Sequence, residues 1–261
     1  MTHVMVPDGV LPWWLSVAGW LAALALLGFA LWRLRGQPAA QMVPLVGVVT
    51  ALMVVVMSFE LVPIGYELHF TVLTGVLVGP WYGAIAALLF NVLRAMLGDG
   101  AFTNIGLNTV ITWLEITLGA TMWALLKPLA RRRAGLAAGL ATFASLLIAT
   151  VAFVGLIALS AIDPGELVET GAFDVQAGGF AESPLAGGLL SVHLAESHAG
   201  EEAGPGGAVG AGFLAFAGAI LILGTIGALI EAIVVGAVVA FIARVRPALL
   251  GLPALAAPIP A

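Results

Sequence analysis

The chain has 261 residues, of which 62% are hydrophobic and 9% charged, whereas an ordinary soluble domain carries about 25% charged residues. Together with a mean hydropathy of +1.14, this composition excludes a water-soluble enzyme and indicates a membrane protein. The chain has no cysteine, and its single lysine, Lys127, precedes Pro128. These facts exclude cysteine-based metal or redox sites and a phosphate-binding loop of the G-x-x-x-x-G-K-[ST] type.

Six apolar stretches follow one another along the chain. Crossing a hydrocarbon core about 30 Å thick takes about 20 helical residues, and five stretches reach that length: 11–32, 41–59, 106–126, 134–160 and 212–242. A sixth, 69–97, is interrupted by Gly79-Pro80, so it crosses either once or twice. Residues 1–9 include Asp8 and no basic residue, which is unlike a signal peptide, and we expect them to lie at the external face.

The positions of the basic residues decide between one crossing and two, because Lys and Arg collect in cytoplasmic loops. A turn at Gly79-Pro80 makes seven crossings and places eight of the nine basic residues inside, with the N-terminus outside and the C-terminus inside. A single crossing leaves only three of them inside. We therefore expect an all-α integral membrane protein of about seven transmembrane helices. The segment 69–78 would be a short or half-length helix, which often marks a binding site.

This topology divides the chain into five parts. They are an external N-terminal segment (1–10), six transmembrane segments (11–160), an external acidic, glycine-rich loop (161–210), a last transmembrane helix (211–246) and a cytoplasmic tail (247–261). The tail is rich in proline and alanine and is expected to be poorly ordered. In the loop, His193 and His198 are not spaced as in an H-E-x-x-H zinc site. We expect a solvated loop, with weak capture of divalent cations as the alternative.

Polar residues inside apolar runs are costly and are candidates for a functional site. Asn104, Asn108, Thr112 and Glu115 recur at intervals of four, four and three residues, so they form one stripe that is expected to face the bundle interior. The stripe either ties helices together by hydrogen bonds or lines a substrate cavity. Glu231 lies about 20 Å from the inner end of its run, near the bilayer centre. It must be protonated or paired, for structure or for transport.

Two further residues lie at predicted outer ends of crossings. Arg94, five residues before Asp99, is expected to pair locally or to extend toward water. His69 begins the half-length segment at the predicted outer face, where His3 also lies. It is either a structural histidine or one of two histidines, distant in sequence, that meet at the outer mouth as metal ligands.

Three stretches resemble the substrate-binding membrane subunit of cobalt/nickel energy-coupling-factor (ECF) transporters, the CbiM/NikM family. At the start, V-P-D-G-V-L-P (6–12) is similar to the family's M-H-[IV]-P-D-G-x-L. In the middle, His69 with G-V-L-V-G-P-W (75–81), L-G-D-G (97–100) and G-L-N (106–108) resembles H-x(n)-G-x-x-x-G-P-W, F-G-D-G-G and G-x-N. Near the end, I-E-A-I (230–233) and A-R-V-R-P (243–247) resemble the family's final helix and its R-V-R-P close.

The resemblance implies that the N-terminal segment folds into the bundle and holds an external metal with the amino terminus, a backbone amide and a histidine, together with His69. An ungapped alignment places Met5 at the family's N-terminal histidine, whereas this chain has His3 two residues earlier. If Met1 is removed, the Thr2 amine, the His3 amide and the His3 imidazole form fused chelate rings, and His69 completes a square-planar set suited to Ni(II) or Cu(II). If Met1 is kept, one more amide is available and His69 becomes optional. Met5 would supply a softer thioether.

The function implied by the resemblance is that of a non-enzymatic S component that imports Co(II) or Ni(II). Its partners would be a transmembrane coupling subunit, two ATP-binding subunits and often a small accessory membrane protein. It would lie, multi-pass and surrounded by membrane lipid, in the cell (inner/plasma) membrane of a prokaryote, with no nucleic-acid partner. The alternative is a secondary divalent-metal carrier, although no convincing internal repeat is present. No pattern typical of an intramembrane enzyme occurs, and nitrogen ligands do not choose between the two ions.

Overall fold

The protein is an all-α integral membrane protein, as predicted. The computed structural model describes residues 13–37, 39–57, 60–61, 66–98, 101–159, 173–174, 179–180 and 209–252. Its helices are α1 (Trp13–Leu34), α2 (Ala39–Met57), α3 (Thr71–Leu97), α4 (Ile105–Leu125), α5 (Lys127–Leu159) and α7 (Val209–Val245), followed by the 3-10 helix η1 (Pro247–Leu250). Two-residue strands pair antiparallel: β1 (Glu60–Leu61) with β2 (Tyr66–Glu67), and β3 (Phe173–Asp174) with β4 (Gly179–Phe180).

Four helices in the described part are long and apolar enough to cross a membrane. They are α1, α3, the segment Lys127–Ala152 of α5 and the segment Ile220–Val245 of α7, and α2 contains the shorter apolar helix Met42–Met57. Outward-facing side chains such as Leu21, Ile233 and Phe241 are about two-thirds exposed, which is the surface expected against lipid. The count of seven crossings and their orientation stay predictions.

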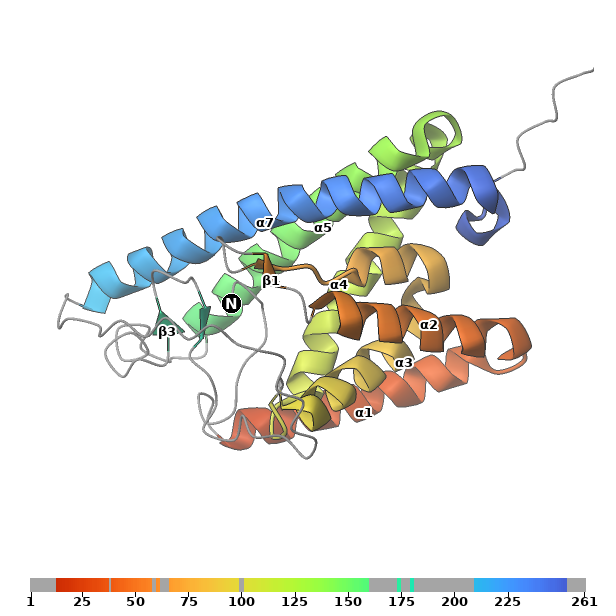
Figure 1. Ribbon diagram of the computed structural model, residues 1–261. Coiled ribbons are helices and arrows are strands. Elements are labelled where there is room, and N and C mark those ends of the chain that lie inside the picture. Colours follow the sequence, from red (N-terminus) through yellow and green to blue (C-terminus); the bar gives the residue numbers. More distant parts are fainter. Residues whose placement is uncertain are drawn as a thin grey trace, which may run out of the picture.

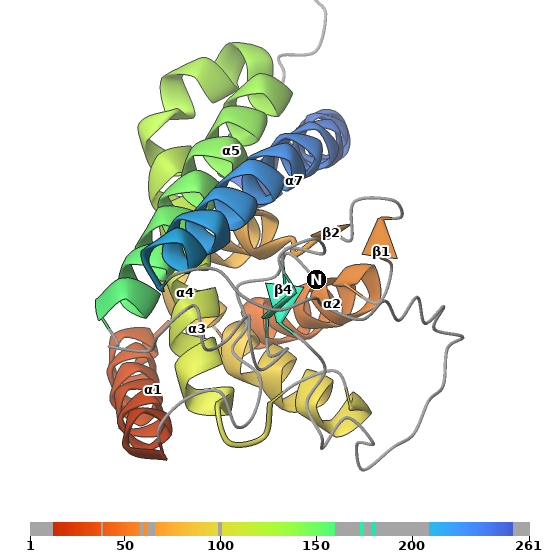
Figure 2. The same cartoon turned by 90° about the vertical axis from the view of Figure 1, so that its left-hand side faces the viewer.

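The helices form two groups with α4 between them. Figure 1 shows α5 and α7 side by side along most of their length, with α1, α2 and α3 on the other side of α4. Figure 2, turned by 90°, shows the same division. Small residues allow the close approach of α5 and α7, because a Cβ atom added to Gly135 would lie 2.7 Å from the carbonyl oxygen of Gly236.

Helix α3 is broken at Gly79, where the sequence predicts a turn. Gly79 has φ 73° and ψ 179°, a backbone conformation available essentially only to glycine. Added Cβ atoms at Gly75 and at Gly83 would both collide with Ile116 of α4. Residues eight apart in a straight helix are separated by about 12 Å, so these two contacts with one residue require a sharp bend between them.

The second half of α3 runs antiparallel to α1. Trp81, just after the break, lies at the C-terminal end of α1, where its ring is 5.2 Å from that of Phe29 and 5.4 Å from the Arg33 guanidinium carbon. The segment after α3 returns to the start of α1, where Ser16 Oγ donates to Asn104 Oδ1 at 2.6 Å. Residues 71–78 therefore form a short helix that ends where residues 80–97 start back (Figure 1).

Two segments beside the predicted crossings are ordered, the basic run before residue 134 and the start of the tail, which was expected to be poorly ordered. The basic run before residue 134 is helical, because α5 begins at Lys127 and continues across a kink at Arg133. Ala130 is buried on one face of this turn and the three arginines are exposed on the other, so the segment packs as an amphipathic helix. The tail is ordered at its start, since Leu250 of η1 is buried in the apolar core.

Candidate functional site

Four buried polar residues meet where the short first half of α3 begins. His69 and Thr71 lie at the start of α3, Glu115 in the middle of α4 and Glu231 in α7. Each has a relative exposure of 5% or less. Three separate segments of the chain therefore bring one imidazole and two carboxyl groups together inside the bundle, and we refer to these four residues as the His69 cluster.

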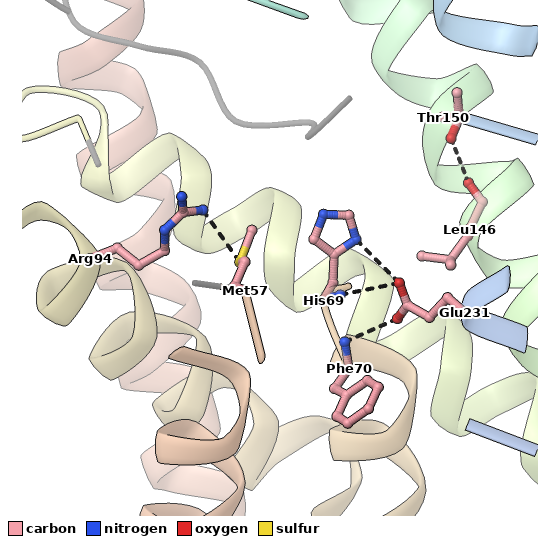
Figure 3. A network of polar contacts seen from close by, with 7 residues as sticks. All are labelled: Met57, His69, Phe70, Arg94, Leu146, Thr150 and Glu231. Carbon is pink, nitrogen blue, oxygen red and sulfur yellow. Dashed lines mark hydrogen bonds and ion pairs between the residues drawn. The ribbon is translucent and has the colours of Figure 1, made fainter. Parts of the chain in front are cut away.

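The carboxylate of Glu231 binds the start of α3 at two points. The backbone N–H of His69 donates to Oε2 at 3.1 Å, and that of Phe70 donates to Oε1 at 3.0 Å. The imidazole Nδ1 of His69 lies 3.5 Å from the same Oε2. Figure 3 shows these three contacts, with the other ring nitrogen pointing away from Glu231. The partner of Glu231, which the sequence left open, is thus the start of the half-length helix.

The backbone at this point has an unusual conformation. Phe70, which immediately precedes α3, has φ 55° and ψ 19° and provides no side-chain hydrogen bond to the helix. Among the described residues it is the only non-glycine with positive φ, a conformation that costs an L residue about 1–2 kcal/mol. The left-handed turn directs two successive backbone N–H groups to one carboxylate, which compensates for this cost.

The polar stripe of α4 faces the interior, as predicted, but its members have different surroundings. Asn104 accepts a hydrogen bond from Ser16 of α1. Thr112 accepts one from Asn91 Nδ2 of α3 at 3.2 Å, and it donates to the carbonyl oxygen of Asn108 at 2.8 Å. Glu115, at the other end of the stripe, interacts electrostatically with His69 and Glu231 and lies beside the Thr71 side chain. The stripe thus ties helices together over most of its length and reaches the His69 cluster through Glu115.

His69 lies inside the bundle. Its backbone and ring contact Glu231, which is about 20 Å along the helix from Arg244, and its side chain is buried. Its access from the outer face stays a prediction. Of the two alternatives for Arg94, extension toward water was wrong. Its relative exposure is 4%, its Nη1 lies 3.3 Å from Met57 Sδ, and its guanidinium lies over the Phe90 ring. Its local pairing stays a prediction.

The remaining predicted ligands lie outside the described residues. These are Met1, Thr2, His3 and Met5, and the same holds for His193 and His198 of the acidic loop and for Asp99. Among the residues that the structure does describe, no three His, Asp or Glu side chains are arranged to hold a metal ion. A metal site that includes His69 would therefore need donors from elsewhere in the chain.

Sequence reasoning missed one member of this site, Thr71, and the contact between two others, His69 and Glu231. Thr71 carries no pattern that separates it from other threonines in apolar helices. The pairing of His69 with Glu231 joins residues 162 positions apart, and half of it consists of backbone N–H groups, which every residue except proline possesses. The sequence signal that could have indicated this pairing is the position of Glu231 in an apolar run, because a carboxyl group inside the membrane needs a partner.

Comparison with known proteins agrees with this architecture. Residues 5–249 match the model of the CbiM family, the cobalt uptake substrate-specific transmembrane region. A fused nickel transport protein of Archaeoglobus fulgidus, NikMN, is 35% identical over 109 residues, which are 40% of this chain and 35% of that protein. The chain thus spans about a third of the length of that relative.

Two solved structures share the fold. The crystal structure of a transition metal transporter aligns with a TM-score of 0.63 at 17% identity, covering 92% of this chain and 93% of that one. A truncated transition metal transporter aligns with a TM-score of 0.62 at 19% identity, covering 91% and 97%. The family model covers nearly the whole chain, including α1 to α7 and the His69 cluster, and this chain therefore belongs to the CbiM family of cobalt uptake transmembrane regions.

Proposed function

We propose that this chain is the metal-binding S component of an ECF-type transporter and that it imports Co(II) or Ni(II) across the cell membrane of a prokaryote. Membership of a cobalt uptake family supports the first ion, and similarity to a nickel transport protein supports the second. The observation that carries the proposal is a buried histidine, His69, at the start of a broken helix and flanked by two acids, Glu115 and Glu231.

The chemistry of the His69 cluster suits a divalent cation of the late first transition row. Imidazole nitrogen is a common ligand of both Co(II) and Ni(II). A divalent charge that enters the low-dielectric interior of a bundle needs compensating negative charge, and Glu115 and Glu231 lie close enough to His69 to supply it. We assign the metal to Nε2 of His69, the ring nitrogen that points away from Glu231 (Figure 3).

The other ligands are proposed to come from the N-terminal segment. They are the free amine of Met1 or, after its removal, of Thr2, the backbone amide and imidazole of His3, and, as the alternative to His3, the thioether of Met5. Amine, amide and imidazole nitrogens with His69 Nε2 make four nitrogen donors, a set that suits Ni(II) in square-planar geometry.

Energy for uptake is proposed to come from other subunits. The chain contains no phosphate-binding loop, so ATP would be bound by two partner ATPase subunits and its energy transmitted by a transmembrane coupling subunit, often with a small accessory membrane protein. The chain itself would catalyse no chemical reaction. The alternative is a secondary carrier that works without ATPases, and uptake of nickel by cells that express the chain with and without candidate ATPase subunits distinguishes the two.

Metal binding tests the proposal directly. Co(II) and Ni(II) are titrated calorimetrically into the purified chain with its native N-terminus in detergent. His69→Ala should weaken binding by one or more powers of ten, each worth about 1.4 kcal/mol, because one strong neutral ligand is lost. His3→Ala should weaken it further, because the imidazole is lost and the chelate ring that it closes with the backbone amide of residue 3 is broken.

The matched control is the double replacement of His193 and His198 by alanine, which removes two histidines of the predicted solvated loop and should leave affinity nearly intact. Unchanged affinity in His69→Ala would refute the assignment of His69. If His3→Ala leaves the affinity unchanged and Met5→Ala lowers it, the side-chain ligand from the N-terminal segment is the thioether of Met5.

A further inference from the structure

The carboxylate of Glu231 caps the start of α3 in a way that the helix itself does not require. An ordinary helix start is closed by a local Ser, Thr, Asn or Asp, which contributes about 1 kcal/mol. Here the acceptor comes from α7, 161 residues beyond Phe70, and it is a fully buried carboxylate, whose burial costs several kcal/mol unless it is paired. The higher cost points to a role beyond closing the helix.

That role is indicated by the contacts that the carboxylate makes with His69. Its Oε2 contacts both the backbone N–H and the ring of His69. The other oxygen, Oε1, accepts a hydrogen bond from Phe70 and holds it in its left-handed conformation. Because the backbone and the side chain of His69 contact the same oxygen atom, the carboxylate fixes both the position and the orientation of the imidazole.

The ring contact also selects a tautomer. A neutral imidazole carries its proton on one nitrogen and a lone pair on the other. A carboxylate oxygen at 3.5 Å from Nδ1 favours the proton on that nitrogen, because its negative charge stabilises the positive end of an N–H bond that is directed toward it. The lone pair is then on Nε2, which points away from Glu231 (Figure 3). Metal-binding histidines typically donate their second N–H to a carboxylate in this way.

We propose that Glu231 is a positioning residue for His69: its carboxylate holds the backbone of residues 69 and 70 and keeps the proton on Nδ1, so that Nε2 is presented to Co(II) or Ni(II). This inference rests on the proposed function, because it assigns a role to Glu231 through a metal ligand. Glu115 differs, since it reaches His69 through electrostatic interaction and comes from another helix, so it provides a matched control.

The test is a double-mutant cycle on the purified full chain with its native N-terminus in detergent, with NiCl2 as the titrant. The variants are Glu231→Gln, Glu115→Gln, His69→Ala and each glutamine combined with His69→Ala. Glutamine keeps the size of Glu231 but replaces one acceptor by an N–H donor group, which faces the donors of residues 69 and 70.

Glu231→Gln should weaken Ni(II) binding by about 10–100-fold in the wild-type background. Combined with His69→Ala it should have a much smaller effect, no larger than that of Glu115→Gln, because only the loss of one negative charge remains once there is no imidazole to position. Glu115→Gln removes a charge of the same cluster, and most of its effect should remain when His69 is replaced. Equal effects of Glu231→Gln in both backgrounds would overturn the proposal, since a general loss of structure or charge acts whether or not His69 is present.

The cycle separates this inference from the proposed function. If His69→Ala leaves Ni(II) affinity unchanged, the assignment of His69 as a ligand fails, and the role of Glu231 fails with it. If His69→Ala weakens binding and Glu231→Gln does not, only the positioning role is overturned.

A second measurement needs no substitution of Glu231 and so does not depend on the folding of that variant. Nitrogen NMR of the metal-free wild-type chain labelled with 15N-histidine, at a pH where the imidazole is neutral, reports which ring nitrogen carries the proton, and the His69 signal is assigned by its loss in His69→Gln. A protonated Nδ1 and an unprotonated Nε2 are expected. The reverse tautomer would overturn the proposal.

Discussion

Replacing Gly79 by alanine isolates the contribution of the break in α3. The φ of 73° and ψ of 179° at this residue lie in a region essentially restricted to glycine. No described atom lies within 4 Å of the position that a Cβ atom would take. The substitution therefore introduces no crowding, and its whole cost arises from the backbone.

The expected magnitude follows from this conformation. A non-glycine residue held in such a region costs about 1–3 kcal/mol, so Gly79→Ala should destabilise the chain by that amount. The matched control is Gly47→Ala in α2, which also has no described atom within 4 Å of the added Cβ and has no positive φ. Because alanine is favoured over glycine within a helix by about 0.5–1 kcal/mol, the control should be neutral or stabilising.

The assay is equilibrium unfolding in mixed micelles with increasing SDS, followed by circular dichroism or tryptophan fluorescence. We expect the two variants to differ by about 1.5–4 kcal/mol, the sum of the two conformational terms. Ni(II) affinity should also fall in Gly79→Ala and not in Gly47→Ala, because the break orients the short helix 71–78, which His69 immediately precedes with Phe70. Equal stabilities of the two variants would refute the argument that Gly79 is required for its backbone conformation.

Two further predictions follow from the topology and the composition. The chain lacks cysteine, so single cysteines can be introduced at two exposed positions, Thr103 before α4 and Gln37 after α1. Thr103→Cys should be labelled by a membrane-impermeant maleimide added outside, and Gln37→Cys only after permeabilisation. The opposite pattern would show that the predicted orientation is inverted. The purified chain alone should neither bind nor hydrolyse ATP, because it has no phosphate-binding loop, and stoichiometric binding of a fluorescent ATP analogue would contradict this.

The sequence by itself determined the properties that depend on residues close to one another along the chain. Length and polarity of the apolar runs predicted a helical membrane protein, since a crossing helix must satisfy its own backbone and present apolar side chains to lipid. The pair Gly79-Pro80 predicted the break in α3, because glycine permits the backbone conformation and proline removes a helical N–H. Spacing alone predicted that the stripe from Asn104 to Glu115 faces inward, because helical periodicity is a local property.

The tertiary structure decided which of these residues meet. Glu231 was known to need a partner, but that partner is the backbone and ring of His69, 162 residues earlier, and a backbone N–H leaves no trace in a sequence pattern. The depth of His69 depended on where the short helix begins relative to α7, and the burial of Arg94 depended on Met57 and Phe90. Such contacts arise from the packing of whole helices, whose relative positions are set by close approaches such as those of Gly75 and Gly83 with Ile116.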